Sequence, residues 1–171
     1  DEAARLPRCL ASLRGVVDEI VVVDTGSTDD TVAVARRFGA KVSVFSWCDD
    51  FAAARNVAIE RATSEWVLSI DADEWIKAGS ADALSGALRD RAAVAYRVKL
   101  INHLDGDRRD EELLTRMFRR RDDVRYRGRV HEQVTDDLAR VVEREGLVWS
   151  VAPGLVLEHD GYLRAIVRER H

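Results

Sequence analysis

The stretch 66–75 constrains the fold of this chain most strongly. It begins with the apolar run 66–68, which is typical of a strand buried on both faces of a parallel sheet. It then turns acidic, with Asp71, Asp73 and Glu74 within four residues. Ligands of open α/β sheets bind just beyond the carboxyl ends of the strands, and alternate residues of an extended chain point the same way. Two carboxylates so placed can share a divalent cation, directly or through water. The alternative is an acidic loop that keeps a turn soluble.

The remaining pattern places this motif in an α/β domain. Helices are expected over residues 2–14, 29–38, 51–62 and 80–89, and strands over residues 19–24, 41–45 and 65–70. This α-β-α-β-α-β-α order predicts a mostly parallel, Rossmann-type sheet flanked by helices. Further strands are expected over residues 95–100, 113–119, 147–151 and 155–158. The second half is therefore predicted to be a strand-rich part of the same sheet.

Composition narrows the class of protein. The chain has 171 residues, which suits one domain, and it is 46 % hydrophobic and 34 % charged. Its net charge of −4 gives no general case for nucleic-acid binding, and no apolar run approaches the length of a membrane span. Cys9 and Cys48 are too few for a disulfide framework, which favours a reduced cytosolic setting.

Four motifs in series resemble the family 2 glycosyltransferases, which have the GT-A fold. They are residues 19–31, residues 50–56, the acidic segment 71–74, and a late set similar to a bacterial branch, at 117–119, 126–128, 130–132 and 158–162. The late set includes the pair His131-Glu132 and a His-Asp-Gly-Tyr run that starts at His159. The resemblance implies one glycosyltransferase domain over residues 1–171, with a nucleotide-binding half at 1–75 and an acceptor-side half at 76–171.

One feature departs from the family. Its members normally begin with an apolar strand ahead of the segment that here starts at Asp1. That strand would lie in the middle of the sheet, beside residues 20–23, and would form part of the nucleotide site. We therefore expect the chain to be a fragment of a longer protein that lacks this first strand.

The nucleotide-binding candidates come mainly from the first half. The resemblance implies that Asp24 contacts the nucleoside, with Gly26 and Ser27 in the turn that follows. The alternative is that Asp24 caps the next helix. Arg55 lies in the first turn of a predicted helix, where the macrodipole disfavours a cation, so we expect it to meet a phosphate or a carboxylate. Asp50 is a further candidate for this site.

The metal and base candidates follow from both the residues and the resemblance. Asp73 is the predicted metal ligand, with Asp71 on the ribose or on a metal-bound water. His159 follows the apolar run 155–157, and the resemblance implies that it closes the metal site. Oxygen ligands favour Mg²⁺ or Mn²⁺, and a histidine ligand favours Mn²⁺. The resemblance makes Glu132 the general base; the alternatives are the acidic residues 110–112, or a structural role for Glu132 paired with a nearby arginine.

These observations lead to one functional prediction and two alternatives. The prediction is metal-dependent, inverting transfer of a sugar from a nucleotide diphosphate sugar, a UDP-sugar above all, to a hydroxyl of an unknown glycan, lipid-linked, protein or small-molecule acceptor. The protein is placed in the cytoplasm, with a peripheral position at the inner face of the membrane as an option. The alternatives are a non-catalytic module that binds nucleotide sugars, and a phosphate-binding or nucleic-acid-binding domain that uses the arginine-rich segment 116–129.

Overall fold

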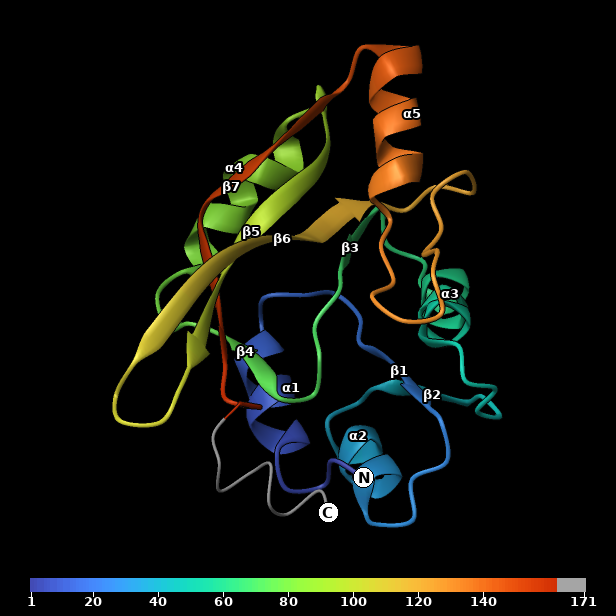
Figure 1. Ribbon diagram of the computed structural model, residues 1–171, viewed down its shortest axis with the longest axis vertical. Coiled ribbons are helices and arrows are strands. Elements are labelled where there is room, and N and C mark those ends of the chain that lie inside the picture. The colour runs from blue at the N-terminus through green and yellow to red at the C-terminus, as the bar shows by residue number, and fades with distance from the viewer. Residues whose placement is uncertain (163–171) are drawn as a thin grey trace.

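The structure, a computed structural model, describes residues 1–162 (Figure 1). The elements of its first half are α1 (Leu6–Leu13), β1 (Val21–Asp24), α2 (Thr31–Arg37), β2 (Lys41–Val44), α3 (Phe51–Arg61), β3 (Trp66–Leu68) and β4 (Glu74–Ile76). Helices and strands alternate as the sequence predicts as far as β3, but the strand β4 that follows β3 was not predicted. Helix α1 starts later than predicted, with Pro7 in its first turn, because a proline suits that position and the preceding residues form a turn instead.

The second half contains the longest strands and one helix that the sequence analysis did not predict. A 3₁₀ turn (Ala81–Ala83) leads into α4 (Leu84–Arg89), followed by β5 (Ala93–His103), β6 (Arg109–Arg119), α5 (Thr135–Glu145) and β7 (Val148–His159). The signal for α5 was present: Leu138 and Val141 are spaced for one buried face, and Gly146 ends the helix with a φ of 65°.

Strand β7 is continuous, although the sequence predicted two strands. Pro153 and Gly154 lie in the interval, where the pairing with β5 shifts register between Val151 and Val156. Proline lacks an N–H for the ladder, and Gly154 has a φ of 75°, so a bulge accommodates both residues without ending the strand.

The sheet is mixed, which corrects the prediction of a mostly parallel sheet. β1 and β2 form a parallel pair, and a five-stranded sheet has the order β3-β6-β5-β7-β4. In the larger sheet β5 and β7 are parallel, while β6 runs antiparallel to β3 and β5, and β4 runs antiparallel to β7. The short connection between β5 and β6 requires antiparallel pairing. β3 and β4 from the first half pair with strands of the second half, so the two halves share one sheet.

Helices cover both faces of this curled sheet and create two cores. One core packs α1, α2 and α4 against the sheet, and it includes Leu10, Val34, Leu84, Val98 and Leu157. The other packs α3 and α5 against the opposite face, and it includes Ile59, Val94, Phe118, Leu138 and Val141. Figure 1 shows α3 and α5 together on one side of the long strands. None of the helices within residues 1–162 is both long and apolar enough to cross a membrane.

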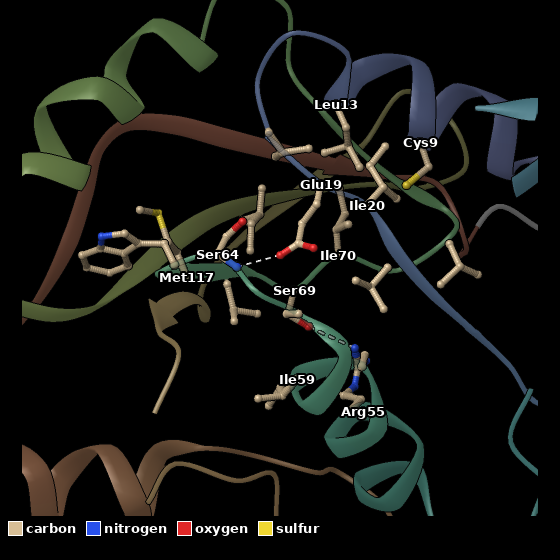
Figure 2. Close-up of a pocket in the computed structure, with 18 of the residues that line it drawn as sticks. Cys9, Leu13, Glu19, Ile20, Arg55, Ile59, Ser64, Ser69, Ile70 and Met117 are labelled. Carbon is tan, nitrogen blue, oxygen red and sulfur yellow. Dashed lines mark hydrogen bonds between the residues drawn. The ribbon is translucent and has the colours of Figure 1, made fainter. Parts of the chain in front are cut away.

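An apolar cleft of about 590 Å³ separates β1 from β3 (Figure 2). Leu13 and Cys9 of α1 approach it from one side and Ile59 of α3 from the other. Within residues 1–162, β1 pairs only with β2 and β3 only with β6, so no strand bridges the two edges. The cleft lies where the sequence predicts the missing strand, and that strand stays a prediction.

Candidate active site

The acidic motif folds into a tight turn between β3 and β4. The N–H of Asp71 donates to Glu74 Oε2 at 2.9 Å, and the N–H of Glu74 donates to the carbonyl of Asp71 at 3.0 Å. The N–H of Ser69 still pairs with the carbonyl of Arg116 at 2.7 Å, which holds the turn against β6. These hydrogen bonds fix the position of the three carboxylates next to β6 and β7.

Two arginines hold the first carboxylate of this turn. Arg116 Nη2 lies 3.0 Å from Asp71 Oδ2 and 2.5 Å from Glu74 Oε1, while Arg55 Nη2 lies 2.7 Å from Asp71 Oδ1. Burial alone would raise the pKa of Asp71, but the two guanidinium groups hold it below its ordinary value. Burial raises the pKa of Glu74, whose side chain is only 2 % exposed, despite the Arg116 contact. Arg55 contacts a carboxylate as predicted, although it is the fifth residue of α3 and lies just beyond the first turn.

Glu132 is attached to the same network. Its Oε1 accepts from Arg55 Nε at 2.5 Å, so Arg55 joins the predicted base to Asp71. The surrounding loop is closed by two backbone hydrogen bonds between Arg127 and Gln133. It is also clamped to α3, because the side chain of Asn56 bonds both the N–H and the carbonyl of Tyr126. These contacts fix the position of a carboxylate that lies 61 residues after Asp71 in the chain.

Asp73 and His159 face each other across a space that suits a divalent cation. Asp73 Oδ2 and His159 Nε2 are 3.6 Å apart, and both side chains are 13 % exposed. Two ligand atoms about 2.1 Å from one ion lie roughly 3.0–4.2 Å apart, so both can bind the same ion. A Cβ added to Gly161 would strike His159 Nε2 and lie 2.6 Å from Asp73 Oδ2, so the glycine keeps this space open.

The protein supplies two ligands here rather than a complete cage. Within residues 1–162, no group of three or more His, Cys, Asp or Glu side chains is arranged to hold a metal ion. Mg²⁺ commonly binds through one or two carboxylates and completes its coordination with substrate phosphates and water, so a two-ligand site fits a cation that arrives with a diphosphate.

The charge around His159 favours its protonated form. Burial lowers the pKa of a histidine, but Asp73 beside the ring and the nearby carboxylates Glu74 and Asp160 outweigh this effect and raise the pKa of His159. A metal must displace that proton, so metal affinity should fall at acidic pH.

The other nucleotide-binding candidates have structural roles in this structure. Asp24 accepts from the N–H groups of Gly26 and Ser27 at 3.2 Å, so its carboxylate shapes the turn after β1 rather than capping α2. Gly26 has a φ of 116°, which such a turn requires of glycine. Asp50 is the N-cap of α3 and accepts from the N–H of Ala53 at 2.9 Å. Contacts of these residues with a nucleotide stay predictions.

Several of the candidate site residues line one polar pocket of about 400 Å³. Its lining includes Asp71, Asp73, Glu74, Arg116 and His159, but not the remaining candidates from the first half of the chain. Glu112, Asn102 and Leu114 from β5 and β6 also line it. Asn102 was not predicted as a site residue, Glu74 was predicted only as part of the acidic motif, and Arg116 only as part of the arginine-rich segment. The alternation of residues 112, 114 and 116 along one face of β6 was the available signal.

The arginine-rich segment does not form one basic surface. Arg116 lies in the pocket, whereas Arg121 pairs with Asp123 and Glu145, and Arg127 pairs with Asp137. In the part of the chain that the structure describes, these arginines therefore point to different places: one lines the pocket, and the others form separate ion pairs.

Comparisons with known proteins identify similar sequences and similar folds. The model of the family described as glycosyl transferase family 2 matches residues 1–142. A TPR repeat-containing protein of Synechococcus elongatus is 41 % identical over 172 residues, covering 99 % of this chain and 42 % of the relative. The SPbeta prophage-derived glycosyltransferase SunS of Bacillus subtilis is 32 % identical over 171 residues, covering 95 % of this chain and 38 % of SunS. The chain thus spans about two fifths of these curated relatives.

Solved structures confirm the GT-A-like α/β fold. Residues 1–349 of TarS from S. aureus match with a TM-score of 0.70 and 18 % identity, covering 94 % of this chain and 58 % of that one. The complex of TarS with UDP matches with a TM-score of 0.53 and 25 % identity, covering 61 % and 34 %. The mannosyltransferase PcManGT from Pyrobaculum calidifontis, in complex with GDP-Man and Mn²⁺, matches with a TM-score of 0.62 and 19 % identity, covering 91 % and 54 %.

Proposed function

The chain belongs to glycosyl transferase family 2, and from that membership we propose that it transfers a sugar from a nucleotide diphosphate sugar to an acceptor hydroxyl. The observation that carries the proposal is the pair Asp73 and His159 facing a space that Gly161 keeps open, in the pocket that Arg116 also lines. Both donor and metal have counterparts among the structural neighbours, because TarS binds UDP and PcManGT binds GDP-Man with Mn²⁺.

Asp73 and His159 would hold the divalent cation. When bound, a cation at this point supplies electrostatic stabilisation for the charge that develops on the leaving diphosphate. The oxygen and imidazole ligands favour Mn²⁺ over Mg²⁺. The structural neighbour that contains UDP favours a UDP-sugar as the donor.

Arg55 and Arg116 prepare the site for an anion. Their guanidinium groups are oriented by Asp71 and Glu74, and guanidinium donors suit the oxygens of a diphosphate. Asp71 in turn is positioned to accept a hydrogen bond from the ribose or from a water in the pocket. Because both guanidinium groups are already held in place, little reorganisation of the site is needed when the donor binds.

Glu132 is the proposed general base. Its half-buried carboxylate has one oxygen held by Arg55, which leaves the other able to accept the proton of an acceptor hydroxyl. Among the residues that the structure describes, the site offers a candidate base but no obvious protein nucleophile. This combination is typical of a single displacement, so we expect the reaction to invert the configuration at the anomeric carbon. The acceptor and the cytoplasmic setting, with its membrane-peripheral option, stay predictions.

Calorimetric titration of UDP in the presence of Mn²⁺ tests the proposal. Asp73→Asn should lose metal-dependent binding while its circular dichroism spectrum stays that of the wild type. Asp122→Asn, in the exposed turn after β6, is the matched control and should bind UDP like the wild type. Unchanged affinity in Asp73→Asn would overturn the metal assignment.

Donor turnover separates an enzyme from a binding module. Release of UDP or GDP from UDP-glucose, UDP-GlcNAc and GDP-mannose with Mn²⁺ should identify one preferred donor. Metal-dependent binding of UDP without turnover of any donor, in a preparation supplied with candidate acceptors, would support a non-catalytic module instead.

A further inference from the structure

Three polar side chains form a row across one face of the five-stranded sheet. Glu112 of β6 accepts from Asn102 Nδ2 at 2.8 Å, and Asn102 Oδ1 lies 2.8 Å from His159 Nδ1. The strand register produces this row, because Asn102 of β5 is paired directly with His159 of β7, and Glu112 is paired two residues away, with Leu100. All three residues line the polar pocket, with Glu112 at its exposed end.

The middle member of the row is almost completely buried. Asn102 is 2 % exposed, so an unpaired amide group there would be costly. Its side-chain nitrogen and oxygen each have a partner, one on each neighbouring strand. An asparagine at this position is therefore oriented by its hydrogen bonds rather than free to rotate.

The chemistry of the partners fixes the direction of each hydrogen bond. An ionised carboxylate only accepts, so Glu112 requires the NH₂ group of Asn102 to face it. The carbonyl oxygen of Asn102 must then face His159, and it accepts a hydrogen bond from Nδ1. A neutral imidazole that carries its proton on Nδ1 has its lone pair on Nε2, which is the atom 3.6 Å from Asp73 Oδ2.

We propose that Asn102, oriented by Glu112, is a positioning residue that fixes His159 in its Nδ1–H form and directs Nε2 at the cation. The inference rests on the metal site of the proposed function and adds two residues that do not touch the metal. Partners of this kind typically contribute about 10–100-fold to metal affinity, since they set the tautomer and orientation of the ligand.

The tautomer of His159 can be measured in the metal-free protein. Long-range ¹H–¹⁵N spectra of ¹⁵N-histidine-labelled protein, recorded as the pH is raised until the ring signals stop changing, distinguish the protonated nitrogen of the neutral ring. A His159→Gln spectrum assigns the signal. We expect the wild type to carry its proton on Nδ1. Asn102→Leu, which lacks the acceptor, should shift the ring toward the Nε2–H form that free histidine prefers, whereas Asn102→Asp should retain Nδ1–H.

The outer member of the row provides a variant with little risk of unfolding. Glu112 is exposed at the rim, and Glu112→Gln replaces an obligate acceptor with a group that can also donate. The amide of Asn102 can then turn over, so both tautomers of His159 should appear. Glu111→Gln is the matched control, because Glu111 is the next residue along β6, pairs with Lys99 and does not line the pocket.

Titration with Mn²⁺, followed by electron paramagnetic resonance, provides the second measurement. Asn102→Leu should bind about 10–100-fold more weakly, Asn102→Asp close to the wild type, and Glu111→Gln like the wild type. The inference is wrong if wild-type His159 carries its proton on Nε2, or if both Asn102→Leu and Glu112→Gln leave the tautomer unchanged. The expected tautomers in a wild-type protein that binds no Mn²⁺ would confirm the positioning role and overturn the metal site of the proposed function.

Discussion

At the scale of single residues, the site depends on side chains that each serve two partners. Arg116 contacts Asp71 and Glu74, while Arg55 contacts Asp71 and Glu132. Buried charges are tolerated only when paired, and removal of one partner leaves the other uncompensated. We therefore expect isosteric substitutions that remove a function without removing volume to be more informative than alanine substitutions.

Glu132→Gln should retain affinity for UDP and Mn²⁺ but lower turnover of the preferred donor. Loss of a positioned base costs about 10²–10⁴-fold in rate, whereas the amide can still accept from Arg55. Steady-state rates of nucleotide release measure the change, with Glu143→Gln on the exposed face of α5 as the control. A wild-type rate in Glu132→Gln would assign the base elsewhere, and Glu112 in the pocket would be tested next.

His159→Ala should weaken binding of Mn²⁺ more than binding of Mg²⁺. Imidazole is a softer ligand than a carboxylate, and its loss leaves an oxygen-only site that suits Mg²⁺. Parallel titrations with the two metals in the presence of UDP provide the comparison. Equal losses for both metals, or none, would return His159 to a structural role.

At the scale of elements, Glu19 connects the two sheets. Its carboxylate accepts from Lys41 at the start of β2, at 2.6 Å, and from the N–H groups of Thr63 and Ser64 before β3, at 2.6 and 2.7 Å (Figure 2 shows the Ser64 contact). Partial burial opposes ionisation, but these hydrogen bonds outweigh it and hold the pKa of Glu19 below its ordinary value.

This lowered pKa predicts how stability depends on pH. A carboxyl group whose pKa is depressed in the folded state contributes its full stabilisation above its unfolded pKa, near 4.3, and loses it as the pH falls below that value. Urea unfolding should show Glu19→Gln to be less stable than the wild type by about 1–3 kcal/mol at pH 7, with the difference shrinking toward about pH 3. Glu60→Gln, on the exposed face of α3, should show no such trend. A difference that stays constant with pH would contradict the role of the charge.

At the scale of the whole molecule, an apolar cleft separates β1 from β3, and no strand within residues 1–162 bridges their facing edges. It extends from Glu19 and Ser64 at one end to Arg55 and Asp71 at the other, along the full length of β3. Asp1 lies beyond the carboxyl end of β1, where its side chain accepts from the N–H of Thr28 at 2.6 Å. A strand that ran parallel to β1 inside the cleft would therefore emerge close to Asp1.

We expect an apolar strand placed ahead of Asp1 to pair with both open edges and to raise stability. Each buried backbone group left unpaired costs about 1–3 kcal/mol, a large part of the 5–15 kcal/mol typical of domains. Thermal unfolding of the 171-residue chain and of an extended chain would show a clear rise in Tm, with stronger binding of UDP, because the cleft ends at Arg55 and Asp71. A control extension with Lys at alternate positions should give no rise. Equal Tm and equal affinity for the chain and its apolar extension would show that the strand is dispensable.

The sequence by itself determined most local elements and the position of the acidic motif at the end of a strand. Apolar runs, caps and glycine turns are short-range signals, so most elements of the first half and the strand-end positions of Asp73 and His159 could be predicted. The family resemblance added Glu132, which has no local signal of its own.

The tertiary structure alone decided which strands are neighbours. The order β3-β6-β5-β7-β4 places Arg116 against Asp71 and sets Asn102 between Glu112 and His159, although these partners are 45, 10 and 57 residues apart in sequence. Strand pairing depends on long-range packing and loop closure, which leave no periodic trace in the chain. The mixed sheet and the row formed by Glu112, Asn102 and His159 therefore could not be predicted from the sequence.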